Sequence, residues 1–291
     1  TRFRILPRCF GYYDVLGKQI IAAEIEEVCI STNSLSFEDY VKCRKMHLLI
    51  HIYHNDGLFG TALDFIKFLK LSPYRWLELL FTEKMFGGVN ELFSKYEQDT
   101  RQELWLKRED LIQNIQKPGT VDSYISGDLG YNLLFVHKAI AMSKFVPDLK
   151  KFAKITLEKL LSENQENTQE NLDFLDDVLN YDSSCISNIF ENLDKTPEIV
   201  LRYDVKKFSN DKNISLSELH LKDPTKIKFI LSNEQLDIIK RSLELYSSSD
   251  IGVSRILTKV FVKKILRRGI SDNESLPKTK EITNSADWPY L

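Results

Sequence analysis

The chain has 291 residues, of which 43% are hydrophobic and 28% are charged. This composition excludes a disordered chain, and the length allows one large or two ordinary domains. The formal net charge of -2 gives no overall attraction to polyanions, so we expect no nucleic-acid partner. No apolar run reaches the roughly 18–20 residues that a membrane span needs, so we expect no transmembrane segment.

The N-terminal part, residues 1–35, is expected to be extended. Residues 20–30 mix Ile and Val with three glutamates, which predicts a strand followed by a polar turn. Ser36 and Asp39 then have the spacing of a capping box, which predicts a helix from residue 37 to about residue 54. Asn55-Asp56-Gly57 should end it, because glycine adopts the left-handed cap conformation without strain.

A run of further helices is predicted downstream. Ser72-Pro73 is a cap followed by proline at the first helical position, which is a typical helix start. Between the helices we expect a glycine-containing loop over 118–130 and a polar, mobile segment over 162–171. The expected helices cover residues 61–70, 73–85, 89–116, 131–144, 147–161 and 172–193.

The pattern changes near residue 196. Residues 198–208 and 226–231 are strand-like and are expected to pair, and Ser232 with Gln235 should cap a helix that ends near residue 246. A last, basic helix is expected over 251–268, followed by a loose polar tail over 270–291. The predicted fold is therefore mainly α, with an extended segment (1–35), a helical domain (36–195) and a small α+β portion (196–269).

The cysteines and histidines offer one candidate metal site. Cys43, His47 and His51 are four residues apart and share one helix face, and His54 lies close to it. Two histidines at i and i+4 can bind one metal ion. We favour a packed or hydrogen-bonded core face instead, because residues 46–53 are apolar nearly all round and no glutamate completes an HExxH motif. The four cysteines form no CxxC pair or disulfide framework, which predicts a reducing cytoplasmic location.

Three other patterns have both a functional and a structural interpretation. Glu24 and Glu26 on one strand face could do acid–base chemistry, but a solvated face or pairing with Arg4 or Arg8 is preferred. The basic last helix could dock on a membrane or an acidic partner, but packing of its apolar side on the domain is preferred. The segment from Gly127 to Gly130 could present amides to a phosphate, but it lacks a complete motif and is expected to be a plain loop.

Several stretches of the first sixty residues belong together as a pattern: Arg4-Ile5-Leu6-Pro7-Arg8, Gly11, Ala23-Glu24-Ile25-Glu26-Glu27-Val28, Ser34-Leu35-Ser36-Phe37-Glu38-Asp39-Tyr40, His47-Leu48 and Asn55-Asp56-Gly57. This pattern resembles a stretch of cobalamin-binding-domain radical SAM proteins that follows the catalytic barrel. A weaker likeness covers Leu231-Ser232-Asn233-Glu234-Gln235-Leu236 and the basic last helix.

The resemblance implies a parent enzyme that uses a 4Fe-4S cluster, S-adenosylmethionine and cobalamin, all held by upstream domains. This chain has neither the CxxxCxxC nor the DxHxxG motif, so no catalytic or cofactor-binding residue carries over to it. Thr1 is not an initiator Met, and we expect such upstream domains as its partners. The implied role is a non-catalytic accessory region that caps or shapes their active site, where the 118–130 loop or the histidine face contacts substrate. The alternative is a helical protein-interaction module with no enzymatic parent.

Overall fold

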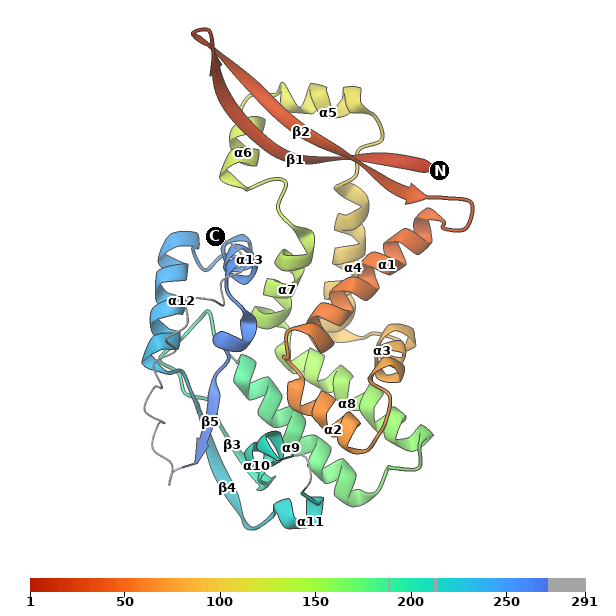
Figure 1. The fold of residues 1–291 in the computed structure, drawn as a ribbon, viewed down its shortest axis with the longest axis vertical. Coiled ribbons are helices and arrows are strands. Elements are labelled where there is room, and N and C mark those ends of the chain that lie inside the picture. Colours follow the sequence, from red (N-terminus) through yellow and green to blue (C-terminus); the bar gives the residue numbers. More distant parts are fainter. Residues whose placement is uncertain (188, 212–213, 272–291) are drawn as a thin grey trace.

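A long β-hairpin stands at one end of a helical body, and a small sheet lies at the other end (Figure 1). The computed structural model describes residues 1–187, 189–211 and 214–271. The hairpin strands β1 (Arg2–Val15) and β2 (Lys18–Ser31) pair antiparallel. Their turn residues, Leu16 and Gly17, have φ of 52° and 73°, and two successive residues with positive φ are what a type I′ hairpin turn requires.

Helix α1 (Phe37–Ile50) begins with the predicted capping box. The hydroxyl of Ser36 accepts a hydrogen bond from the Asp39 amide at 3.1 Å, and the Asp39 carboxylate accepts one from the Ser36 amide at 3.3 Å. The helix continues as one π-helical turn, His51–Asn55. Gly57 follows with φ of 69°, so the predicted start and the predicted stop are both confirmed.

The helical body is built around one apolar core. Buried aromatic residues anchor it: the Trp76 indole donates to Thr156 Oγ1 at 3.0 Å, and the Tyr53 hydroxyl donates to the Leu149 carbonyl at 3.2 Å. Helix α8 packs against α3 and α9, and α2 packs against α9. The helices are α2 (Gly60–Phe68), α3 (Pro73–Thr82), α4 (Gly87–Gln102), α5 (Arg108–Ile115), α6 (Thr120–Ser126), α7 (Leu133–Lys144), α8 (Val146–Glu163) and α9 (Gln169–Ile186).

Two predictions for this part are wrong in detail, and a third segment is only partly helical. The single helix expected over 89–116 is divided into α4 and α5, because the backbone of Trp105 leaves the helix to pair with Ile5 of β1 at 2.9 and 2.8 Å. The loop expected over 118–130 contains α6. Half of the polar segment over 162–171 is helical, since α8 extends to Glu163 and α9 begins at Gln169 with the Thr168 hydroxyl as its cap. The mobility expected for this segment stays a prediction.

The C-terminal part is a three-stranded antiparallel sheet with helices beside it. The strands β3 (Glu198–Tyr203), β4 (His220–Ile230) and β5 (Arg268–Ser271) lie in the order β3-β4-β5, which confirms the predicted pairing of the first two. The remaining elements are α10 (Val205–Asn210), α11 (Leu216–Leu219), α12 (Asn233–Tyr246), α13 (Asp250–Lys259) and a 3-10 turn (Val262–Lys264). The predicted capping box at Ser232 and Gln235 is present at the start of α12.

Two boundaries here differ from the prediction. The strand expected over 198–208 ends at Tyr203, and α10 follows. The helix expected over 251–268 ends at Lys259, because Arg268–Ser271 pairs with Ile227–Ile230 of β4 as a third strand. Of the expected loose tail, residues 272–291 lie outside the described residues.

Candidate functional site

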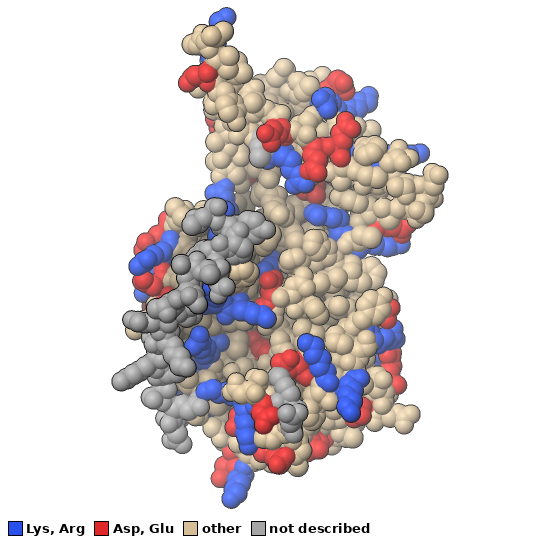
Figure 2. Space-filling view, in the orientation of Figure 1, with Lys and Arg blue, Asp and Glu red and all other residues tan. Residues whose placement is uncertain are grey.

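The distal half of the hairpin exposes a group of apolar side chains. It projects beyond α5 and α6, and Figure 2 shows this end as mostly uncharged atoms that stand off the body. Elsewhere on that face, acidic and basic side chains are interspersed. The exposed fractions range from 42% to 99% for Tyr12, Tyr13, Val15, Leu16, Ile20 and Ile21. Contiguous exposed apolar surface of this kind marks an interaction site in soluble proteins.

One face of the hairpin is held by α6. The rings of Phe10 and Tyr124 stack with centroids 4.0 Å apart, and the Tyr12 hydroxyl donates to Asp122 Oδ1 at 2.9 Å. The hydrogen bond to this carboxylate raises the pKa of Tyr12. These contacts fix the direction in which the hairpin projects, because strand alternation places Phe10 and Tyr12 on the same side.

On the opposite face of the distal hairpin, no helix within the described residues makes contacts like those of α6. Tyr13 pairs with Ile20 and Gly11 pairs with Ala22, and residues directly opposite in an antiparallel pair share a face. The Tyr13 ring lies over Gly11, where a Cβ atom would come within 2.9 Å of it. The result is a small aromatic and aliphatic surface that faces solvent.

Two of the three hairpin glutamates are engaged in ion pairs rather than grouped as a catalytic pair. Glu26 pairs with Arg8, which confirms the preferred interpretation for this residue. Glu27 points to the other face, where Arg108 of α5 lies 3.6 Å from it. Glu24 is exposed. Nothing in this geometry positions two carboxylates around a common reacting atom.

Most of the histidine face lies at the surface, so the expectation of a packed or hydrogen-bonded core face is wrong for Cys43, His47 and His54, whereas His51 is half-buried. Cys43, His47 and His54 are exposed, because the core takes the opposite side of the helix. The rings of His47 and His51 are neighbours, with centroids 4.9 Å apart. A ring nitrogen of His54 lies 3.2 Å from Asn55 Oδ1. The structure therefore brings together two of the four candidate ligands, His47 and His51.

A buried ion pair lies beside His51 and was missed by sequence reasoning. Lys138 on α7 is only 1% exposed and pairs with Asp56, while His51 Nδ1 lies 3.7 Å from the same carboxylate oxygen. Burial lowers the pKa of Lys138, although the charge of Asp56 acts to raise it. Burial acts to raise the pKa of Asp56, but the adjacent His51 ring and Lys138 together lower it. The only sequence signal was a lysine within the apolar run Leu133–Lys144.

A second buried pair is structural. His137 is 1% exposed, and its Nε2 lies 3.0 Å from Asp99 Oδ2. Burial lowers the pKa of His137, although Asp99 acts in the opposite direction. Because the ring is enclosed between α4 and α7, it joins these helices and presents no base to a substrate.

The glycine segment and the basic helix are both used for packing. Gly127 and Gly130 have φ of 80° and 69°, and the guanidinium of Arg255 on α13 donates to the Ser126 carbonyl beside them. The apolar side of α13 packs in the core, as expected. Arg267 lies beyond the helix, and its Nε donates to the Ser187 carbonyl at 2.8 Å.

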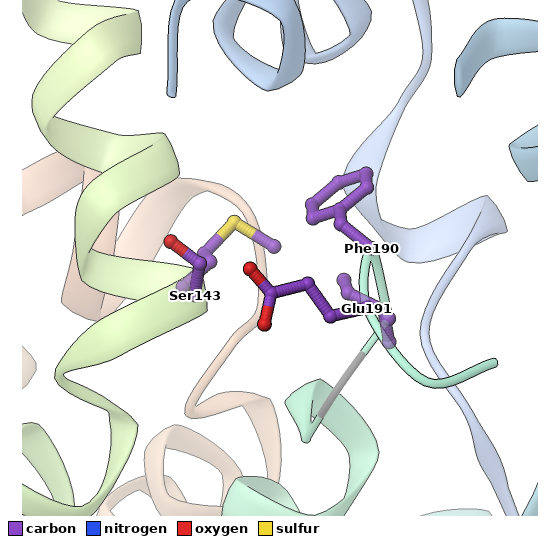
Figure 3. Close-up of a pocket in the computed structure, with 5 residues that line it drawn as sticks. Ser143, Phe190 and Glu191 are labelled. Carbon is purple, nitrogen blue, oxygen red and sulfur yellow. The ribbon is translucent and has the colours of Figure 1, made fainter. Parts of the chain in front are cut away.

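A shallow hollow lies where α7 meets the segment after α9 (Figure 3). It is lined by Met142, Ser143, Ile189, Phe190 and Glu191, and its cavity volume is only about 10 Å³. Ligand sites usually occupy about 300–1,000 Å³. The Ser143 hydroxyl donates to the Ala139 carbonyl at 2.8 Å, within its own helix. The hollow is therefore too small to be an active site.

No three His, Cys, Asp or Glu side chains within residues 1–187, 189–211 and 214–271 form a group able to hold a metal ion. In the same part of the chain, no helix has both the length and the apolar composition of a membrane span. Comparison of the chain with models of protein families, with curated proteins and with solved structures finds no match.

Proposed function

We propose that this chain is a non-catalytic accessory region of a cobalamin-dependent radical SAM enzyme, and that it docks on the catalytic domains through the distal hairpin. One observation carries the docking step: Leu16 is 99% exposed at the tip and has a φ of 52°. Outside glycine, a left-handed backbone costs about 1–2 kcal/mol. Asparagine would suit this turn better than leucine.

Leu16 therefore carries two local costs in the isolated chain, a strained backbone and an apolar side chain in water. Transfer of a leucine side chain from water into a protein interface contributes about 1.5–3 kcal/mol, which offsets the backbone cost. The free face with Tyr13 and Ile20 adds further apolar area beside it. Contact between the tip and a partner surface would thus explain why Leu16, Tyr13 and Ile20 are apolar although they are exposed in the isolated chain.

The resemblance supports the choice of partner. Residues 2–60 carry it, and they form the hairpin, α1 and the π-helical turn. In the proposed enzyme the upstream domains hold the 4Fe-4S cluster, S-adenosylmethionine and cobalamin, and this region covers or shapes their active site. Exclusion of water would protect radical intermediates there. A reducing cytoplasmic location belongs to the same proposal, since Cys29, Cys43 and Cys185 are free thiols.

The first test is the coding sequence immediately upstream of Thr1 in the source genome. An in-frame CxxxCxxC motif, with a DxHxxG-like motif further upstream, supports the radical SAM parent. A reading frame that opens just before Thr1, or that contains neither motif, refutes it. The hairpin would then belong to the alternative, an interaction module with no enzymatic parent.

The docking step is tested in the full-length protein by Leu16→Asn, which keeps the turn and removes the apolar side chain. Leu245→Asn is the matched control, because Leu245 is 71% exposed on α12, away from the hairpin. We expect Leu16→Asn to reduce turnover and to expose the hairpin to limited proteolysis, while Leu245→Asn changes neither. Equal behaviour of the two variants would refute docking through the tip.

A further inference from the structure

His47 near the end of α1 and His51 in the π-helical turn have a ring separation compatible with binding one metal ion. His47 and His51 are one helical turn apart, and their ring centroids are separated by 4.9 Å. A metal ion about 2.0–2.1 Å from a ring nitrogen is about 3.2 Å from the ring centroid. Two imidazoles that bind one ion at angles of about 90–109° therefore have centroids about 4.5–5.2 Å apart. The observed separation falls within this range.

The surroundings of His51 orient it as a ligand. Its side chain is 21% exposed, and its buried Nδ1 lies 3.7 Å from Asp56 Oδ2. Metal-binding histidines usually donate their second ring N–H to a carboxylate, which fixes the tautomer and directs the other nitrogen to the metal. Asp56 is placed for this role, which leaves Nε2 of His51 as the nitrogen available to a metal ion.

The neighbouring cations do not oppose a bound cation as free charges. Arg44 lies 3.5 Å from Glu103, and Lys138 is paired with Asp56. Burial, followed by the charges of His51 and Arg44, lowers the pKa of His47.

We infer that His47 and His51 form a two-ligand site for a borderline divalent ion such as Zn²⁺ or Ni²⁺ on the exposed face of α1. Cys43 does not join His51 in one site, because the two are two turns, about 12 Å, apart along the helix. Two protein ligands leave the other coordination positions to water. This site is independent of the proposed docking function and of any cofactor that an upstream domain holds.

The test is titration of the chain with Zn²⁺ alone, in competition with a chromophoric chelator, at pH 7. We expect one equivalent to bind, with a loss of affinity of about tenfold or more in His47→Gln and in His51→Gln. His54→Gln and Cys43→Ser are the matched controls, because both residues are exposed near the pair and neither is a ligand in this geometry. Nuclear magnetic resonance of the imidazole nitrogens should show Zn²⁺-dependent shifts at Nε2 of His51.

Three outcomes would overturn the inference: no saturable binding, binding that survives His47→Gln, or a loss in Cys43→Ser as large as in His51→Gln. The last outcome would mean that Cys43 takes part in the site, as a cysteine–histidine chelate with His47 one helical turn earlier. Since the readout is metal binding by the chain itself, failure here leaves the docking proposal unaffected, and failure of docking leaves this site unaffected.

Discussion

Asp182 of α9 caps a different helix, and its removal should destabilise the fold. The residue is 4% exposed, and its two carboxylate oxygens accept from the amides of Thr61 and Ala62 at 3.2 and 3.0 Å. These amides belong to the first turn of α2, whose own N-cap residue, Phe59, provides no side-chain cap. Asp182→Ala leaves two buried donors without their acceptor, so we expect a loss of about 2–4 kcal/mol in the free energy of unfolding.

The pH dependence of this contribution shows which force dominates. Burial outweighs the hydrogen bonds and raises the pKa of Asp182 to about 7. In the unfolded chain an aspartate ionises near pH 4. Between about pH 4 and pH 7 the unfolded state has therefore lost the proton while the folded state keeps it, and stability falls as the pH rises. At about 1.4 kcal/mol per pH unit, this group alone accounts for a loss of about 4 kcal/mol over the window.

Asp182→Asn isolates this effect, because asparagine has nearly the same shape and does not titrate. Urea unfolding followed by circular dichroism, at several values between pH 5 and pH 8, gives the free energy of unfolding of both proteins. We expect the wild type to lose stability relative to Asp182→Asn as the pH rises to about 7, and the difference to level off above it. A difference that is constant, or that changes in the opposite direction, would mean that the α2 amides hold Asp182 ionised and that the reasoning is wrong.

Three further substitutions test local features by the same urea assay. Ser36→Ala removes the cap of α1 and should cost about 1 kcal/mol, and a neutral result would show that the Asp39 side of the box is sufficient. Gly127→Ala places a side chain at a φ of 80° against Arg255, so it should cost about 1–2 kcal/mol. Arg267→Met removes the donor to the Ser187 carbonyl and should cost about 2–4 kcal/mol, whereas a stabilised variant would mean that the buried charge opposes folding.

Local sequence signals predicted the helix starts well, because a cap is decided within four residues. Ser36, Ser72 and Ser232 each accept the backbone hydrogen bond that their spacing predicted. The chain breaks that were missed depend on distant contacts instead. Nothing near Trp105 interrupts the helical pattern, and the break there depends on its pairing with Ile5, a hundred residues earlier.

The same distinction explains the end of the basic helix. Its amphipathic pattern continues to residue 268, so periodicity alone favoured a helix over the whole segment. Val260, Phe261 and Val262 gave a weak opposing signal, because β-branched and aromatic side chains favour extended backbone. The decisive factor is the open edge of β4, which Arg268–Ser271 completes as β5.

The candidate site could be predicted only in part, for a related physical reason. Helical spacing correctly placed His47 and His51 together, but it could not show whether their face is buried, which depends on where α7 packs. It also could not find Lys138 or Asp182, whose partners lie 82 and about 120 residues away in the sequence. The hairpin shows the reverse case: its local pairing is regular, yet Leu16 violates the preferences of its own turn. Where a side chain does not suit its own backbone conformation, a contact with a partner can account for it, and this is why docking should be tested at the tip of the hairpin.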